Sequence, residues 1–98
     1  MSAALVLTPK FLQLHSGEFD PQTIFQLLLA NRRVRSPLQA LELCGNLRQL
    51  DLSGNEITTL GTALGSMGLL EVLDIRNNRL SSIEGIPEDS LTTLRVLR

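Results

Sequence analysis

Leucine-rich stretches recur in this chain at intervals of 23 to 24 residues. The stretches 47–57 (LRQLDLSGNEI) and 70–80 (LEVLDIRNNRL) both follow the pattern LxxLxLxxNx(I/L). The stretch 24–34 (IFQLLLANRRV) keeps every apolar position but carries Arg32 in place of the asparagine, and a further unit begins at residue 94. One such unit cannot bury its apolar face alone. The repeat therefore predicts units that stack and share one core.

The apolar spacing predicts a short strand at the centre of each unit. Side chains alternate along a strand, so Leu50 and Leu73 should point into the core while their neighbours face the other way. Asn55 and Asn78 come where the chain turns away from the strand, and an amide can donate and accept hydrogen bonds there. We expect a structural asparagine ladder. Because the Arg32 side chain cannot accept, the first unit should be atypical, with its turn open to water.

These repeats resemble those of leucine-rich-repeat proteins over residues 24–98. Their length resembles the short, intracellular class found in phosphatase-regulatory and small-ribonucleoprotein scaffold proteins. The resemblance implies an α/β fold: a right-handed solenoid segment with a parallel sheet on its concave side. Glycines and prolines between the strands favour short helical or 3-10 return segments. The expected units begin at residues 24, 47 and 70, with an incomplete one at 94.

Residues 1–23 are predicted to form an N-terminal capping segment. Thr8 suits a helix N-cap, Pro9 suits the first helical position, and Gly17 suits the end of the helix. Such a helix would cover the apolar end of the first unit. The sequence ends inside the fourth strand without a C-terminal cap, so we expect a fragment or a short isoform of a longer protein. An uncovered last strand also predicts self-association through its edge.

Composition restricts the classes of function. The chain has 22 leucines, 43% hydrophobic and 19% charged residues, and a net charge of −1, so no strong field draws it to nucleic acid. Its longest apolar run, residues 3–7, is far shorter than the about 18–20 residues that cross a bilayer, and it lacks the features of a signal peptide. With a single cysteine, the chain is expected to be an intracellular, cytoplasmic protein.

Residues able to carry chemistry are few. His15 is the only histidine and Cys44 the only thiol, and no nucleotide, metal or redox motif accompanies them. We therefore expect no catalytic residues, no cofactor, no metal and no enzymatic activity. The basic cluster of Arg32, Arg33 and Arg35 supports an alternative function as a ribonucleoprotein-assembly module that contacts RNA or an acidic partner.

The preferred function is a protein-interaction scaffold that binds a protein or peptide on the concave face of the sheet. Asp51 and Asp74 form an expected acidic stripe between basic edges, while Leu28 and Val72 are expected to be exposed apolar residues there. The identity of the partner does not follow from the sequence. The candidate partner-binding residues, all on or beside the predicted strands, are Gln26, Leu28, Arg48, Gln49, Asp51, Glu71, Val72, Asp74 and Arg76.

Overall fold

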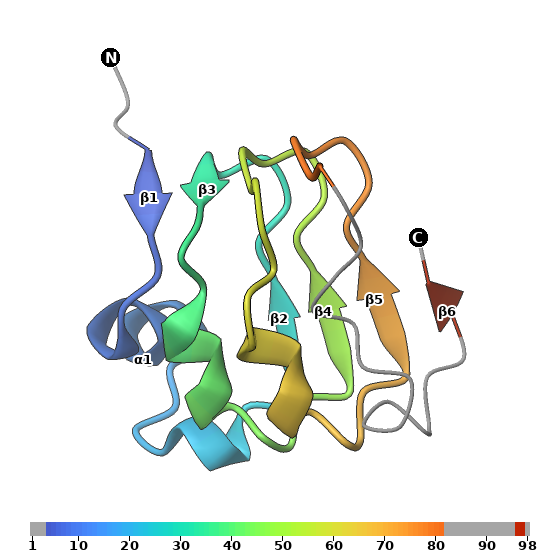
Figure 1. Cartoon of the computed structure of the whole chain (residues 1–98). Helices are drawn as coiled ribbons and strands as arrows, with labels where there is room; N and C mark the ends of the chain where they lie inside the picture. Colours follow the sequence, from blue (N-terminus) through green and yellow to red (C-terminus); the bar gives the residue numbers. More distant parts are fainter. Residues whose placement is uncertain (1–3, 82–95, 98) are drawn as a thin grey trace.

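A computed structural model describes residues 4–81 and 96–97 of the chain. Its main sheet has four short parallel strands in the order β2-β4-β5-β6 (Figure 1). Residues at equivalent positions of successive units face each other, as in the pairs Gln26 with Gln49 and Gln49 with Val72. The predicted parallel sheet is confirmed. The strands are β2 (Gln26–Leu28), β4 (Gln49–Asp51), β5 (Val72–Asp74) and β6 (Val96–Leu97).

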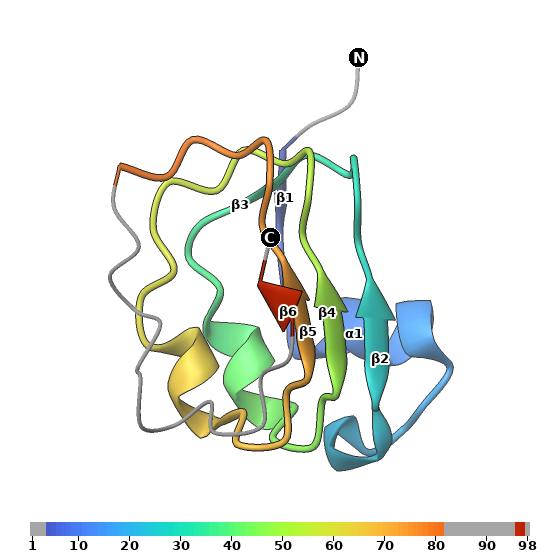
Figure 2. The ribbon, with the colours of Figure 1, turned by 90° about the vertical axis from the view of Figure 1, so that its right-hand side faces the viewer.

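The return segments form a second layer opposite the sheet. They contain the 3-10 helices η2 (Gln39–Leu43) and η3 (Ala63–Ser66), which pack against each other (Figure 2). In both, the residue after the helix donates its backbone N–H to a carbonyl inside it, and these residues are Cys44 and Met67. The predicted short 3-10 returns are therefore confirmed, as is the α/β solenoid fold.

The hydrophobic core lies between these two layers. Leu50 and Leu73 are fully buried, and Leu27 occupies the same position in the first unit. A buried leucine contributes roughly 2 kcal/mol, so this repeated position provides much of the drive to stack. Among the described residues, the buried polar ones are Asn55 and Asp74, exposed by 5% and 8%.

The predicted N-terminal helix is α1 (Pro9–Ser16). The Thr8 hydroxyl accepts a hydrogen bond from the backbone N–H of Phe11 at 3.0 Å, and Gly17 ends the helix with a φ of 76°. The helix buries Leu12 completely and packs against η2 and the 3-10 helix η1 (Pro21–Thr23). It therefore caps the first unit. No helix among residues 4–81 and 96–97 has the length and apolar character to cross a membrane.

A second, two-stranded sheet was not predicted. Strand β1 (Leu5–Val6) pairs in parallel with β3 (Val34–Arg35), and the N–H of Leu5 donates to the carbonyl of Arg33 at 2.9 Å. The short apolar run before the helix therefore covers the turn of the first unit. The first unit is capped in two places, by α1 over the 3-10 helices and by β1 over β3.

The turn of the first unit is also paired on its other side. The side-chain oxygen of Asn55 accepts hydrogen bonds from the backbone N–H groups of Arg32 at 3.0 Å and Val34 at 2.9 Å. The expectation that this turn is open to water is therefore wrong for these backbone N–H groups, because the asparagine of the next unit reaches back to them. Residues 31–33 of the turn are nevertheless exposed.

The division of the chain at residues 23 and 24 stays a prediction. Residue 94, where the fourth unit was expected to begin, lies outside the described residues. The described part of that unit is strand β6, in which Val96 pairs with Val72.

Candidate functional site

The concave face of the sheet carries the residues that alternate with the core leucines. Its first column runs Gln26, Gln49, Val72 along the register of the strands. The side-chain amide of Gln26 donates to the side-chain oxygen of Gln49 at 2.8 Å. Gln26 is exposed, whereas Gln49 and Val72 are half-buried. Val72 therefore offers less free apolar surface than the sequence suggested.

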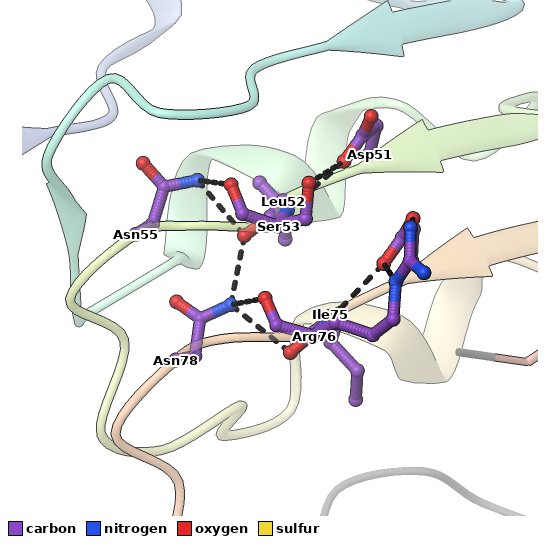
Figure 3. A network of polar contacts seen from close by, with 8 residues as sticks. Asp51, Leu52, Ser53, Asn55, Ile75, Arg76 and Asn78 are labelled. Atoms are coloured by element: carbon purple, nitrogen blue, oxygen red, sulfur yellow. Dashed lines mark hydrogen bonds and ion pairs between the residues drawn. The ribbon is translucent and has the colours of Figure 1, made fainter.

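The second column runs Leu28, Asp51, Asp74. Leu28 is 45% exposed and is the most open apolar side chain of the two columns. The carboxylate of Asp51 accepts hydrogen bonds from the backbone N–H of Ser53 at 2.9 Å and from its hydroxyl at 2.7 Å (Figure 3). Asp51 therefore fixes the turn that follows β4, and the residue itself is half-buried.

Asp74 does not present a free negative charge on this face. Its side chain is held by Arg76, which donates to Oδ1 from Nε at 3.1 Å and to Oδ2 from Nη2 at 2.9 Å (Figure 3). These hydrogen bonds raise the pKa of Arg76. The acidic stripe expected from the sequence is therefore reduced to Asp51, because Asp74 is nearly buried and its charge is neutralised by Arg76.

The remaining candidates lie at the ends of the strands. Arg48 and Glu71 precede β4 and β5, and the N–H of Glu71 donates to the carbonyl of Arg48 at 2.8 Å. Arg76 lies beyond the opposite end of β5. The nine candidates thus form two columns on the sheet with charged residues at both ends, rather than one compact cluster.

The two asparagines at the turns have a structural role. The amide of Asn55 donates to the carbonyl oxygens of Leu29 at 2.9 Å and Leu52 at 2.8 Å. The amide of Asn78 donates to the carbonyl of Leu52 at 2.8 Å and to that of Ile75 at 3.1 Å (Figure 3). Each asparagine therefore bridges its own unit and the preceding one.

Sequence reasoning missed a second repeated position beside the asparagines. Asn31, Gly54 and Asn77 have φ values of 57°, 68° and 59°, in the left-handed region. Glycine and asparagine tolerate this conformation better than other residues. A Cβ atom on Gly54 would also overlap the side chain of Asn31. The signal was present in the sequence as an Asn or Gly directly before residues 32, 55 and 78.

A charged row crosses the units just after these turns. The Arg33 Nε atom lies 2.6 Å from Glu56 Oε2, and the Arg79 Nη1 atom lies 3.8 Å from Glu56 Oε1. The hydrogen bond from Arg33 holds the pKa of Glu56 below its usual range. The predicted basic cluster is therefore partly neutralised, whereas the side chains of Arg32 and Arg35 are exposed.

The histidine and the cysteine occupy structural positions. His15 lies on α1 with its ring stacked on that of Phe11, at 5.6 Å between centroids. Cys44 is a free, buried thiol at the end of η2, and burial raises its pKa to about 11. Within the described part of the chain, no group of three or more His, Cys, Asp or Glu residues could hold a metal ion.

Comparison with known proteins agrees with the geometry of the stacked units. A family model described as leucine-rich repeats, in two copies, matches residues 45–88. A solved internalin from Listeria monocytogenes superposes with a TM-score of 0.70 and 34% identity, covering 79% of this chain and 22% of the internalin. The chain is a leucine-rich-repeat protein.

This leucine-rich-repeat protein also resembles part of a curated enzyme. It is 34% identical over 67 residues to an adenylate cyclase from Podospora anserina, which is 68% of this chain and 3% of the cyclase. The chain thus spans only small parts of the longer proteins that it matches. Such a short match carries no enzymatic activity over to this chain. Leucine-rich-repeat domains in general bind other proteins on their concave surfaces.

Proposed function

We propose that this leucine-rich-repeat protein is a non-enzymatic scaffold that binds a protein or peptide partner on its concave face. The observation that carries the proposal is Leu28, a large apolar side chain 45% exposed on a rigid parallel sheet. It lies beside the hydrogen-bonded pair of Gln26 and Gln49. An apolar contact bordered by side-chain amides suits a partner surface of mixed character.

Charge at the strand ends supports the same function. Arg48 is exposed and Glu71 half-exposed at one end of the strands, and Arg76 is exposed at the other. Asp51 lies between them and is half-buried. Opposite charges distributed around an apolar contact fix the orientation of a partner and speed its association more than they add to its affinity.

The alternative is contact with RNA through Arg32, Arg33 and Arg35. The ion pair between Arg33 and Glu56 weighs against it, because an RNA phosphate would have to compete with a carboxylate already in place. Binding to RNA that weakens by orders of magnitude between low and physiological salt would favour this alternative. Our proposal predicts no RNA retention at low salt. A free, buried Cys44 is compatible with the intracellular setting that we propose.

The test uses a photo-reactive amino acid placed at Gln49 on the concave face. The control places the same group at Gln39, which is exposed on η2 in the opposite layer. Both versions are expressed in cells and irradiated. We expect one partner to be cross-linked from position 49 and not from position 39. Equal cross-linking from both positions, or cross-linking from 39 alone, would contradict binding on the concave face.

A pair of charge variants then measures the contribution of that face. Gln49→Arg adds bulk and charge to the middle of the sheet, and Gln39→Arg makes the same chemical change on η2. With the purified partner we expect Gln49→Arg to weaken binding at least tenfold and Gln39→Arg to leave it unchanged. Circular dichroism of both variants should match the parent chain, so that a loss of binding reports on the surface.

A further inference from the structure

Strand β2 is the end strand of the main sheet, so one of its edges has no neighbouring strand among the described residues. Backbone groups of alternate residues in a parallel strand point to opposite sides. The N–H of Leu29 donates to the carbonyl of Asp51 on β4 at 2.8 Å, so odd-numbered residues face β4. The N–H and C=O groups of Gln26 and Leu28 therefore face outward, away from the sheet.

The two-part cap does not pair with this edge. Strand β1 pairs with β3, and α1 packs mainly against η1 and η2. Between residues 4 and 81, no backbone hydrogen bond joins the outward groups of β2 to either part of the cap. An edge of this kind is a template for pairing with another extended chain.

A groove runs along the same edge. It has a volume of about 410 Å³ and lies between the end of α1 and β2, with Ser16 and Glu18 on one side and Phe25 and Leu28 on the other. Phe25 is 54% exposed and Leu28 45% exposed. The groove therefore combines unpaired backbone groups with two large apolar side chains.

The charge on the groove indicates the character of an occupant. Glu18 is exposed, lines the groove, and accepts a hydrogen bond from the hydroxyl of Thr23 at 3.2 Å. The Glu18 carboxylate favours basic side chains nearby, whereas Leu28 favours apolar ones. Alternation along an extended chain can supply the two kinds on opposite faces.

We infer that an extended peptide segment, with apolar residues alternating with basic ones, adds to the sheet as a strand beside β2. The inference rests on the proposed scaffold function and makes it more specific, because it names the form of the bound segment. Its backbone hydrogen-bonds to Gln26 and Leu28, and its apolar side chains contact Leu28 on the concave face. Such strand addition derives affinity from main-chain hydrogen bonds and specificity from alternate side chains.

The test uses a synthetic peptide that alternates lysine and valine, with three matched versions. One version is N-methylated at the valines, one at the lysines, and one replaces lysine by glutamate. Only one alternate set of peptide N–H groups can face β2. We therefore expect one N-methylated version to bind about tenfold more weakly and the other to bind like the parent, because tenfold corresponds to about 1.4 kcal/mol, roughly one backbone hydrogen bond. The glutamate version should bind more weakly than the parent.

Amide NMR of the whole chain locates the bound peptide. We expect the N–H groups of Gln26 and Leu28 to shift and to exchange more slowly with solvent when the lysine and valine peptide is added. Leu28→Pro removes one outward N–H, and proline is tolerated at a strand edge. It should weaken binding more than Leu28→Ala, which keeps the N–H. If Leu28→Pro does not fold, the N-methylated pair and the amide shifts still decide the question.

Four outcomes would overturn the inference. The first two are equal binding of both N-methylated peptides and no binding of the parent peptide. The third is a set of amide NMR shifts confined to the middle of the concave face. The fourth is slow amide exchange at Gln26 and Leu28 that depends on protein concentration when no peptide is present. The last outcome would identify a second copy of the chain as the occupant. If the cellular partner cross-links at Gln49 but the amides of Gln26 and Leu28 do not respond to peptide, strand addition beside β2 fails and binding on the concave face stands. If the edge responds but the partner avoids Gln49, the concave-face proposal fails instead.

Discussion

Asn55 and Asn78 donate hydrogen bonds to the same acceptor, the carbonyl oxygen of Leu52, each at 2.8 Å. Asn55 approaches it from within its own unit and Asn78 from the following unit (Figure 3). A carbonyl has two lone pairs, so it can accept from both amides. The turn after β4 is therefore held from both sides along the solenoid.

We expect Asn55→Ala to lower the free energy of unfolding by about 3 kcal/mol, because it leaves several buried backbone groups without partners. Asn55 is 5% exposed and bonds to Arg32, Val34, Leu29 and Leu52. Asn78→Ala should cost less, about 1 kcal/mol, since its bonds are only partly buried. Urea unfolding followed by circular dichroism measures both.

Asn55→Asp is a control that keeps the shape of the side chain and removes its hydrogen-bond donor. The carboxylate can accept from Arg32 and Val34 but cannot donate to Leu29 and Leu52 at neutral pH. It should therefore be nearly as destabilising as Asn55→Ala. A variant as stable as the parent chain would mean that the donated hydrogen bonds contribute little.

Three glycine substitutions separate backbone strain from steric overlap. Gly54→Ala combines a left-handed φ of 68° with a contact that must displace the exposed side chain of Asn31, so we expect the largest loss of stability, about 1–2 kcal/mol. Gly61→Ala has a φ of 57° and open space, and should cost about 1 kcal/mol. Gly65→Ala has neither and should be neutral. Thermal unfolding gives the order, and equal losses for Gly54→Ala and Gly65→Ala would contradict the explanation.

Cys44 should react slowly with thiol reagents in the folded chain. Burial raises its pKa to about 11, so the reactive thiolate is rare at neutral pH and the reagent has little access. We expect Cys44 to react slowly at pH 7.5, and fast in denaturant, with an aromatic disulfide reagent that releases a coloured thiolate. The absorbance of that thiolate measures the reaction. Rapid labelling of the folded chain would mean that η2 opens readily.

Glu56 should make stability depend on pH in a definite direction. Its pKa is lowered in the folded chain by the hydrogen bond from Arg33, relative to an ordinary value of about 4.3. Its contribution is therefore fully present above that value and is lost as the pH falls through the lowered pKa. We expect the melting temperatures of the parent and Glu56→Gln to differ at pH 7 and to converge at acidic pH. A difference that grows toward low pH would have the wrong sign.

Much of the fold could be predicted because the repeat specifies which side chains must be buried together. The positions of Leu50 and Leu73 in the pattern predict the parallel sheet, and the glycines and prolines between strands predict the short returns. Strand β1 could not be predicted, since a pair of residues such as Leu5 and Val6 has too few alternating positions to show a strand period.

The concave face was harder to predict than the fold. The period of two places Asp51 and Asp74 on the same face, but it does not reveal what else their carboxylates contact. The ion pair from Arg76 to Asp74 depends on a side chain two residues along the chain, beyond the strand. Strand alternation thus gives the direction of a side chain, whereas the charge available to a partner depends on neighbours that the pattern does not specify.

The hydrogen bonds that the asparagines make to two units have a consequence for how the chain unfolds. Because Asn55 and Asn78 each bond to two turns, part of the energy of every unit belongs to its boundary with the next. Loss of one unit therefore weakens its neighbour, and unfolding should spread along the chain as a cooperative front. A pulling force that separates two units would have to break these bonds together with those of the sheet.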